Sequence, residues 1–504
     1  MRHEIRLLFI PVISVLFFLY FSAPAHAVIP SLLGPLQGLL AILPQILLFI
    51  AAGFAALFSF KRWRTRFSRL ASARTRTKVI VCIAVFAVIG GSVAALIVYG
   101  RWTIGPGGAA SSTATQDIQS PDQIWSAFRG GLTRTGNIDE QPGPEIGEEV
   151  WVFRDMDFRT GNFSSSPAVT GDRVYVGSAQ ADIFSKGGVL YCLDAGTGEM
   201  IWKYQTKREI FSSPAVVDGK VYIGEGLHSD VDSELYCLDA TTGSFLWSFQ
   251  TSSHVESSPA VVDGRAFFGG GADGVYCVDA ETGEQIWLYP GIYVSVSPVV
   301  HDGSVYVGTG YGETGIYCLD ADTGALKWKL PTMYPVWSSP SLASGRAYFG
   351  IGNGNFLESD DKPYGKVVCI DAKTSELIWY YEVDDSVLTA VAVIPGLTGS
   401  GYVYFGSRDG NVYCLDADSG VLKWKWATGK PVVSSPAVVG GNIYFGSDNG
   451  TVYCLDRSEG RLKWEFDTTI TAPDGTRILS SPAVANGRLY VGSSKFYFFC
   501  IGKS

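Results

Sequence analysis

The chain has 504 residues, with 39 Lys and Arg against 48 Asp and Glu, and a net charge of −9. Residues 1–78 hold ten basic residues and one acidic residue, and the remaining 29 basic and 47 acidic residues give the rest of the chain −18. So acidic a domain repels nucleic acid and anionic lipid, which excludes nucleic-acid partners. The sequence also lacks a P-loop, a nucleophile elbow, an H-E-x-x-H motif and a C-x-x-C-H motif,.

The N-terminal part carries targeting and membrane signals. Residues 1–27 hold an apolar stretch after Arg2 and Arg6 and end in Ala-His-Ala, which predicts a signal peptide, with an uncleaved first membrane helix as the alternative,. Residues 36–60 and 79–99 are uncharged, and each is long enough to span the ~30 Å hydrocarbon core of a bilayer,. Residues 28–100 are therefore predicted to form a membrane region with two helices.

The segment 61–78 between these two spans contains eight basic residues and no acidic residue. The positive-inside rule places such a loop in the cytoplasm, so the chain beyond residue 100 is expected on the extracytoplasmic side of a cell membrane, periplasmic or at the cell surface. Residues 101–122 form the predicted linker, in which 105–120 are rich in Gly, Ser, Thr and Ala,.

Residues 123–504 contain one unit copied many times. Eight cysteines recur at intervals of 40 to 51 residues: Cys192, Cys237, Cys277, Cys318, Cys369, Cys414, Cys454 and Cys500. After each of the first seven, a tryptophan follows ten residues later: Trp202, Trp247, Trp287, Trp328, Trp379, Trp424 and Trp464. A fixed offset inside a repeat of variable length indicates a repeated supersecondary unit.

One copy, 430–468, shows what the unit is. Its apolar runs SSPAVV, NIYFGS, TVYCLD and LKWEF are rich in β-branched and aromatic residues and are separated by Gly, Asn, Asp or Ser,. Four short strands in ~40 to 50 residues is the size of one propeller blade. The sequence therefore predicts an all-β, eight-bladed β-propeller preceded by transmembrane helices.

The eighth copy is incomplete, because the chain ends at Ser504 before a tryptophan can follow Cys500. Residues 149–154 read EVWVFR, contain Trp151 and precede the first copy with no strands of their own. We predict that this N-terminal strand completes the last blade and closes the ring, which removes open sheet edges.

The repeated cysteines are predicted to be reduced and buried. Equivalent points on neighbouring blades are separated by a sheet layer of ~10 Å, whereas a disulfide needs Cα atoms within ~7 Å. There is no C-x-x-C pair, and the propeller holds only His228, His254 and His301. No metal site is expected on these grounds.

The repeat resembles the pyrroloquinoline-quinone (PQQ) type propeller repeat, through SSPAVVDGKVYIG (212–224), YCLDATTGSFLW (236–247) and their copies. The stretch Asp-Ala-x-Thr-Gly-x-x-x-Trp resembles that family's tryptophan-docking motif, in which the indole packs across to the next blade. The fifth copy departs from it with Ser375 in place of Gly, and the seventh with Glu459 in place of Thr. The segment WSAFRGGLTRTG (125–136) resembles the family's lead-in. The resemblance covers residues 123–504 and is specific for fold but not for function.

A candidate binding surface is found by comparing the copies three residues before the SSP proline or its equivalent. These positions vary freely in an otherwise repetitive scaffold: Ser164, Phe211, Glu256, Ser295, Trp337, Val387, Val433 and Leu479. Phe211 and Trp337, with Glu256 nearby, are predicted to form a ligand- or partner-binding mouth at the propeller funnel. The alternative is that each residue simply packs locally.

Two loop insertions, 225–234 in blade two and 355–365 in blade five, are rich in carboxylates. Clustered carboxylates can bind calcium, but solvated loops explain them as well.

Three classes of function remain open. The first is a non-enzymatic binding or scaffold module for protein or cell-envelope partners, similar to the propeller lipoprotein that assists outer-membrane protein assembly, although no lipobox cysteine follows the signal. The second is a quinoprotein dehydrogenase using PQQ with calcium, although such enzymes carry an adjacent cysteine pair that is missing here. The third is a surface adhesion or carbohydrate-binding protein. We expect the first, with no catalytic residue and no cofactor.

Overall fold

The computed structural model describes residues 125–131, 133–138, 142–157, 160–181, 186–228, 230–396, 401–470 and 476–503, all within one compact unit, Thr115–Ser504. The predicted signal peptide, membrane spans, basic loop and linker lie outside these residues. Within them, no helix is long and apolar enough to cross a membrane.

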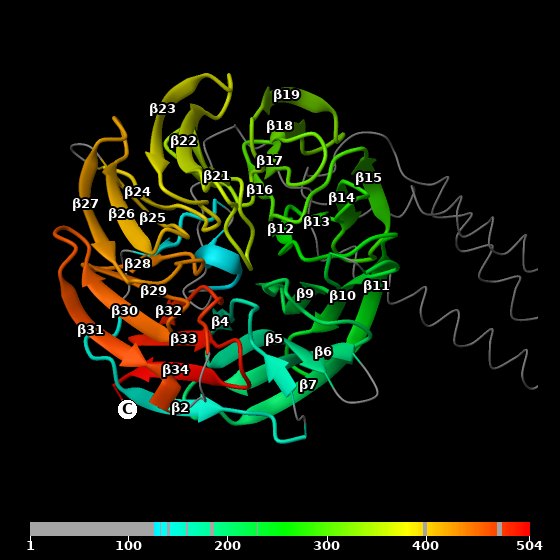
Figure 1. The fold of residues 1–504 in the computed structure, drawn as a ribbon. Coiled ribbons are helices and arrows are strands. Elements are labelled where there is room, and N and C mark those ends of the chain that lie inside the picture. The colour runs from blue at the N-terminus through cyan, green and yellow to red at the C-terminus, as the bar shows by residue number, and fades with distance from the viewer. Residues whose placement is uncertain are drawn as a thin grey trace, which may run out of the picture. The chain divides into compact units, whose positions relative to one another are not determined.

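Eight antiparallel sheets surround a central axis and form a closed ring, which confirms the predicted all-β, eight-bladed propeller (Figure 1). From the axis outward, blade one consists of β4 (Ala168–Thr170), β5 (Arg173–Ala181), β6 (Lys186–Asp194) and β7 (Met200–Thr206), with β3 (Thr160–Asn162) beside β5. Blade two consists of β8 (Ala215–Val217), β9 (Lys220–Gly224), β10 (Glu234–Asp239) and β11 (Phe245–Gln250). Blade three consists of β12 (Ala260–Val262), β13 (Arg265–Gly269), β14 (Val275–Asp279) and β15 (Gln285–Tyr289), and blade four of β16 (Val299–His301), β17 (Ser304–Gly308), β18 (Gly315–Asp320) and β19 (Leu326–Pro331).

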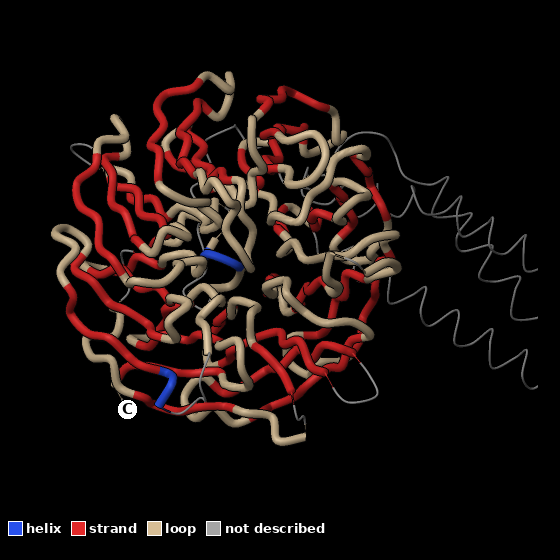
Figure 2. The backbone as a smooth tube through the Cα atoms, viewed as in Figure 1, coloured by secondary structure: helices blue, strands red, loops and turns tan. Residues whose placement is uncertain are grey.

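Blades five to eight follow the same order. Blade five consists of β20 (Ser341–Ala343), β21 (Arg346–Gly352), β22 (Gly365–Asp371) and β23 (Leu377–Val383), and blade six of β24 (Ala392–Ile394), β25 (Tyr402–Gly406), β26 (Asn411–Asp416) and β27 (Leu422–Ala427). Blade seven consists of β28 (Ala437–Val439), β29 (Asn442–Gly446), β30 (Thr451–Asp456) and β31 (Leu462–Asp467), with β1 (Asn137–Ile138) beside β28. Blade eight consists of β32 (Ala483–Ala485), β33 (Arg488–Gly492), β34 (Phe498–Gly502) and β2 (Glu149–Phe153). Two short 3₁₀ helices, η2 (Phe128–Gly130) and η3 (Thr468–Ile470), complete the described elements. Figure 2 shows that strands and loops make up almost all of the ring.

The position of each strand in its blade explains its sequence. Third strands such as β30, TVYCLD, are buried on both faces between neighbouring blades, so they are almost continuously apolar,. Outermost strands such as β31, LKWEFD, face solvent on one side and alternate exposed and half-buried residues,.

The N-terminal strand closes the ring as predicted. β2 pairs antiparallel with β34, with Trp151 opposite Cys500 and Phe153 opposite Phe498. The turn just before β2 also serves blade seven, since the Trp464 indole N–H donates to the Pro144 carbonyl at 3.2 Å and the ring lies against Gly147. This turn completes the eighth docking motif, which the sequence comparison missed because no Cys-Leu-Asp precedes it.

All eight repeat tryptophans lie between neighbouring blades. Each indole N–H donates to a main-chain carbonyl of the next blade at 2.9–3.2 Å: Trp151 to Ala195, Trp202 to Ala240, Trp247 to Ala280, Trp287 to Ala321, Trp328 to Ala372, Trp379 to Ala417, Trp424 to Arg457 and Trp464 to Pro144. The ring then covers a glycine such as Gly198, whose φ is +74° and where a Cβ would meet the Trp151 ring at 2.6 Å. The glycine is therefore favoured both by the turn and by the indole above it, although Ser375 takes the same place in blade five with φ +62°,.

The SSP motif has a structural role at each serine. The first hydroxyl accepts from a glycine N–H of the second strand, as Ser212 does from Gly224 at 3.1 Å. The second hydroxyl accepts from the N–H at the same position in the preceding blade, as Ser258 does from Ser213 at 2.9 Å. These bonds link the inner strands around the ring, except that Ala390 of blade six has no hydroxyl to accept from blade five.

The eight repeat cysteines are buried and unpaired. Each lies opposite the repeat tryptophan on the outer strand, as Cys454 lies opposite Trp464. Burial raises the pKa of the Cys237 and Cys454 thiols to about 12, so they stay protonated and unreactive at neutral pH,.

Residues 125–138 run through the central channel, where Figure 1 shows η2 at the centre of the ring. Main-chain bonds join this segment to the inner strands of five blades: Trp125 with Val169, Ser126 with Val216, Thr133 with Leu342, Thr135 with Val393 and Gly136 with Val438. The Arg134 side chain adds blades three and four, because it donates to the Ser258 and Pro298 carbonyls just before their inner strands. Arg129 and Arg134 are only 3% and 2% exposed, so the segment fills the channel around them. We call residues 125–138 the channel plug.

Candidate functional site

The four strands of each blade run antiparallel, so the connection before the inner strand and the one between the second and third strands lie at the same end,. We call this end of the propeller the mouth. Three loops there contribute polar and aromatic side chains: 225–233 between β9 and β10, 309–314 between β17 and β18, and 353–364 between β21 and β22.

The predicted binding residues lie at the mouth but differ in accessibility. Phe211 and Glu256 are half-buried, whereas Trp337 is only 6% exposed. Trp337 is buried because the Tyr311 ring of the 309–314 loop covers it edge-on at 4.9 Å. Phe211 has no aromatic partner among the described residues.

Of the eight positions compared before the SSP proline, the one in blade six was assigned one residue too early, to Val387. Thr389 Oγ1 accepts from the Gly406 N–H at 3.0 Å, so Thr389 takes the place of the first SSP serine, and Leu388 is the residue that corresponds to Trp337. Val387 instead lies against Gly350, as Val336 lies against Gly308. The error arose because blade six reads Thr-Ala-Val where the other copies carry a serine and a proline.

With this correction, one side of the mouth is apolar. Trp337, Leu388 and Val433 form a buried cluster, and Leu479 packs against it. These residues occupy equivalent positions in blades five to eight. For this half, local packing describes the side chains better than an open binding surface does.

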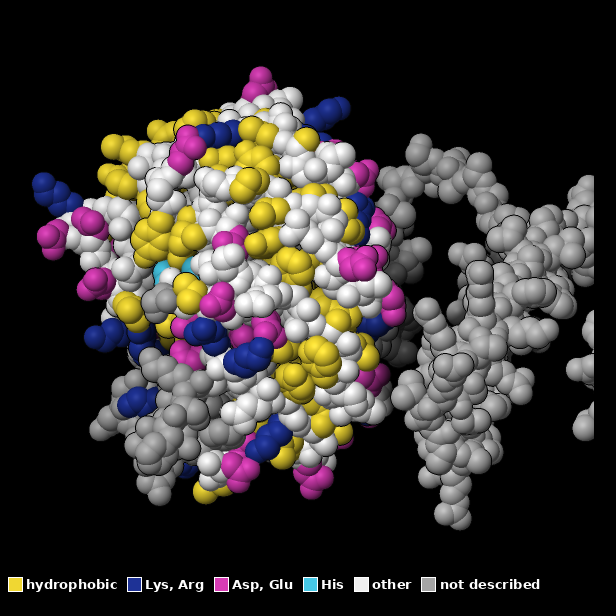
Figure 3. All heavy atoms as spheres, turned by 90° about the vertical axis from the view of Figure 1, so that its right-hand side faces the viewer, with side chains coloured by type: hydrophobic (Ala, Val, Ile, Leu, Met, Phe, Trp, Pro, Cys, Tyr) yellow, Lys and Arg dark blue, Asp and Glu magenta, His cyan; other side chains and the backbone are white. Residues whose placement is uncertain are grey.

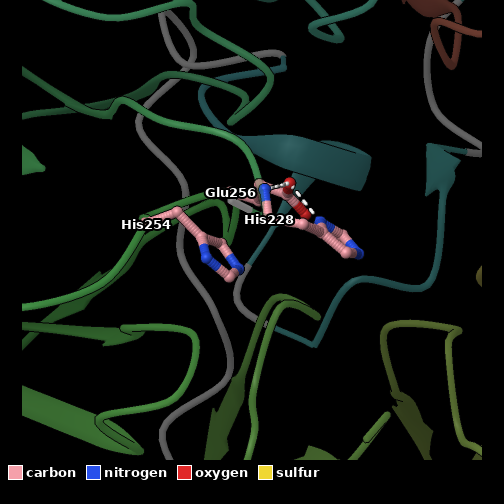
Figure 4. Close-up of side chains that lie close together, drawn as sticks. All are labelled: His228, His254 and Glu256. Carbon is pink, nitrogen blue, oxygen red and sulfur yellow. Dashed lines mark hydrogen bonds and ion pairs between the residues drawn. The ribbon is translucent and has the colours of Figure 1, made fainter. Parts of the chain in front are cut away.

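The opposite side of the mouth, in blades two to four, is polar. Glu256 Oε1 lies 2.5 Å from His228 Nδ1 and accepts from the His228 main-chain N–H at 2.9 Å (Figure 4). The His254 ring is buried and stacks on the His228 ring at 5.3 Å with an interplanar angle of 12°. His254 Nε2 contacts Ser295 Oγ at 3.1 Å and Tyr293 OH at 3.3 Å, and its Nδ1 contacts Ser253 Oγ at 3.2 Å.

The electrostatic surroundings separate the two imidazoles. The hydrogen bond with Glu256 raises the pKa of His228, because the carboxylate favours the charged ring,. Burial lowers the pKa of His254, so this ring is neutral at pH 7 and can act as a ligand or hydrogen-bond partner,.

Aromatic rings join the polar and apolar sides. Tyr311 lies 5.0 Å from Tyr293 and 4.9 Å from Trp337, both edge-on, and the His228 ring lies 5.8 Å from Tyr311. Tyr311 is itself 50% exposed. The loops of blades two and four thus meet over Trp337 and bring Glu256 and Trp337, both predicted from sequence, into one network.

The blade-five loop reaches across the mouth to blades six and eight. Arg408, after β25, donates from Nε to Ser359 Oγ at 3.3 Å and lies 4.0 Å from Asp385. Arg477, before β32, donates to the Phe356 carbonyl at 3.2 Å and pairs with Asp448. Both guanidinium groups are therefore already paired with carboxylates, and they hold a loop whose Leu357 side chain is 79% exposed.

The chemistry available at the polar side is that of binding. Ser295 contacts His254, but the other nitrogen of that ring meets the Ser253 hydroxyl and not a carboxylate. The arrangement therefore lacks the acid that orients the histidine of a hydrolytic triad. Two imidazoles and one carboxylate can instead hold a cation or a polar ligand.

A further acidic residue lies just behind this network. Glu225 is fully buried at the start of the 225–233 loop, and its Oε2 accepts from the Arg208 N–H at 3.0 Å. Burial, with some repulsion from Glu234, raises the pKa of Glu225 to about 7. Glu234, which pairs with Lys207, has a lowered pKa although burial alone would raise it.

Because the folded pKa of Glu225 lies above its unfolded value, stability should fall as pH rises from about 4.5 to about 7 and stay low above that,. We expect Glu225→Gln to stabilise the protein at pH 8 by on the order of 2–3 kcal/mol and to have little effect near pH 4.5. Urea unfolding at both pH values measures this. Glu234→Gln is the matched control: because the pKa of Glu234 is lowered, this substitution should destabilise the protein at pH 8. An equal effect of Glu225→Gln at both pH values would contradict the assignment.

The family model for the outer membrane protein assembly factor BamB matches residues 140–290, 227–332, 275–362 and 363–498. The chain belongs to this family. No curated protein sequence matches it.

Three solved structures show how widely this fold is used. BamB from Moraxella catarrhalis is 18% identical, with a TM-score of 0.53 over 71% of this chain and 98% of that one. A europium-containing methanol dehydrogenase is 17% identical, with a TM-score of 0.56 over 74% and 91%. The computationally designed Ika8 protein is 15% identical, with a TM-score of 0.55 over 72% and 100%. An assembly factor, an enzyme and a design fit about equally well, so these likenesses establish the fold alone.

Sequence comparison of the copies identified Glu256 and Trp337 but missed His228, His254, Tyr293 and Tyr311. These four lie in loops of different length, where the copies cannot be aligned. One local signal was present: His254 and Glu256 are two apart in an extended segment, which places them on the same side. The carboxylate-rich loop 225–234, considered for calcium, contributes its histidine to the cluster, while its Asp230 pairs with Arg208 at 3.1 Å.

Proposed function

We propose that this protein is a non-enzymatic binding module that holds a protein partner of envelope assembly against the loops at its mouth, on the extracytoplasmic side of a membrane. The observation that carries the proposal is the exposure of large apolar side chains on these loops. Tyr311, Phe356 and Leu357 are 50%, 45% and 79% exposed, and they come from blades four and five. Exposed aromatic and aliphatic side chains of this kind are typical anchors of protein interfaces.

The surface of the ring also carries apolar patches. On the side drawn in Figure 3, which is the right-hand side of Figure 1, hydrophobic side chains gather in patches between interspersed Asp, Glu, Lys and Arg. Hydrophobic patches rimmed by charge are the usual composition of a protein-binding surface. Family membership supports a partner from outer-membrane protein assembly, and the membrane location rests on the apolar and basic segments of residues 1–100.

The quinoprotein alternative fits the described residues less well. PQQ is a flat tricarboxylate, so its site needs an exposed aromatic floor and free cationic partners. Trp337 is already covered by Tyr311, so it offers no open aromatic floor. Arg477 pairs with Asp448 and Arg408 lies 4.0 Å from Asp385, although Arg408 Nη1 and Arg477 Nε have no hydrogen-bond partner. Without an open aromatic floor, these residues do not form a cradle for the quinone. Among the described residues, the exposed Tyr311 and Phe356 rings make no ring contact with each other, so they give no specific support for a carbohydrate site.

Leu357→Ser is expected to weaken partner binding about 30-fold, equivalent to the ~2 kcal/mol of a typical interface anchor, without lowering the melting temperature. The measurement starts with a photo-cross-linking residue at position 357 in cells and identification of the captured protein by mass spectrometry. The captured protein is then purified, and its affinity for wild type and variant is compared.

Val421→Ser is the matched control, because Val421 is 59% exposed but lies in the turn before β27, at the opposite end of the blade. Equal affinity of the Leu357→Ser variant and wild type would remove the mouth from consideration. Capture of a protein with no part in envelope assembly would contradict the proposed partner class.

A further inference from the structure

We propose that His228, His254 and Glu256 form a binding site for a divalent transition-metal ion, with zinc the best match. The three side chains converge from two segments of neighbouring blades, the 225–233 loop and the connection before β12 (Figure 4). One donor atom from each lies within 4.8 Å of the others. The small number of histidines in the sequence predicts no metal site, yet two of the three described histidines come together here.

The spacing needs only a small adjustment to accept an ion. Ligand atoms around a tetrahedral zinc, at ~2.0–2.2 Å from the metal, lie about 3.4 Å apart. His228 and Glu256 are already closer than that, at 2.5 Å, so the ion would replace the proton that they share. The separation of up to 4.8 Å must shorten by about 1.4 Å, which the 36% exposed His228 side chain can supply by rotation,.

The neighbouring hydroxyl groups prepare His254 for this role. Metal-bound histidines almost always hold their second ring nitrogen in a hydrogen bond that fixes the ring. His254 has Ser253 on Nδ1 and Ser295 with Tyr293 on Nε2, so either nitrogen can bind the ion while the other keeps a partner.

The donor set selects the kind of metal. Two imidazoles and one carboxylate favour zinc and its borderline neighbours over calcium or magnesium, which prefer oxygen ligands only. The His228–Glu256 ion pair alone leaves the stacked His254 unexplained. Among the described residues, no other group of three His, Cys, Asp or Glu side chains comes together at this spacing. A bound ion would hold the blade-two loop against blade three.

The test uses the full-length protein without a histidine tag, stripped of metal with a chelator. Titration with Zn²⁺ by calorimetry and with Co²⁺ by visible absorption is expected to show one ion per chain, with Kd of about 10 µM or tighter. Zn²⁺ should also raise the melting temperature. His228→Gln and Glu256→Gln should each weaken binding at least tenfold and abolish the thermal shift.

His301→Gln is the matched control, since His301 is exposed at the end of β16 and its substitution should leave binding unchanged. Absence of binding at about 100 µM Zn²⁺ would overturn the proposal. So would unchanged affinity in both the His228→Gln and Glu256→Gln variants, which would place the ion elsewhere in the chain. Melting curves of the metal-free variants separate loss of ligand from loss of fold.

Discussion

Deletion of residues 149–153 from the full-length chain should lower the melting temperature by more than 10 °C or cause aggregation. The deletion removes the outer strand of blade eight and leaves β34 as an open sheet edge,. It also removes Trp151, whose indole joins blade eight to blade one through the Ala195 carbonyl. Loss of a buried Trp alone typically costs about 3–5 kcal/mol, before any ladder hydrogen bond is counted. Thermal melts followed by circular dichroism and light scattering measure the effect.

One control variant and one peptide show whether closure is the cause. Val152→Thr changes a side chain that is 36% exposed on the same strand and should melt within a few degrees of wild type,. A synthetic peptide covering residues 142–157, added to the deletion variant, should restore part of the melting temperature because it supplies the missing strand in trans. A deletion variant that melts like wild type would show that the ring does not depend on β2.

The ring itself could be predicted from sequence because its determinants are local. The Cys-to-Trp offset of ten residues fixes the third strand, the turn and the outer strand in one short segment, and Trp151 without a preceding cysteine identified the closing strand. The SSP serines and the docking glycine are likewise explained by bonds that recur in nearly every blade. A contact that recurs in each blade requires the same residue type at the same position of each copy, so it can be recognised in the sequence.

The mouth could be predicted only in part, because its contacts join residues that no repeat relates. His228 meets Glu256 across 28 positions, and Tyr311 covers Trp337 from a loop of another blade. Variation between copies found Glu256 and Trp337, but it could not show that Trp337 is buried. Val387 was chosen in error because blade six lacks the serine and proline by which the equivalent residue is located in the other copies. Predictions about residues 1–122 concern a part of the chain outside the described residues and remain predictions.

The channel plug carries the second large expected effect. Arg134 donates from Nε to the Pro298 carbonyl at 2.8 Å and from Nη2 to the Ser258 carbonyl at 2.9 Å, and its guanidinium lies over the Phe128 ring at 5.4 Å. Arg129 is buried in the same plug and donates to the Pro436 carbonyl. Burial lowers the pKa of Arg134 to about 9, so it still carries its charge at neutral pH. The inner strands of blades three and four thus bond to a cation at the ring axis.

Arg134→Ala should therefore destabilise the protein by about 3 kcal/mol, because two buried carbonyls lose their donor and a cavity opens at the axis. Arg134→Met keeps the volume and removes the cost of burying a charge, so it should fall between Arg134→Ala and wild type. Arg154→Ala, at an exposed arginine that bonds the Tyr497 hydroxyl, is the control and should change stability by less than about 1 kcal/mol,. Urea unfolding of the four proteins measures the order. If Arg134→Met proves as stable as wild type, the cost of burying the charge equals the gain from its hydrogen bonds. The plug would then act through its main-chain bonds to the inner strands, and Arg134 would not be needed to hold the ring together.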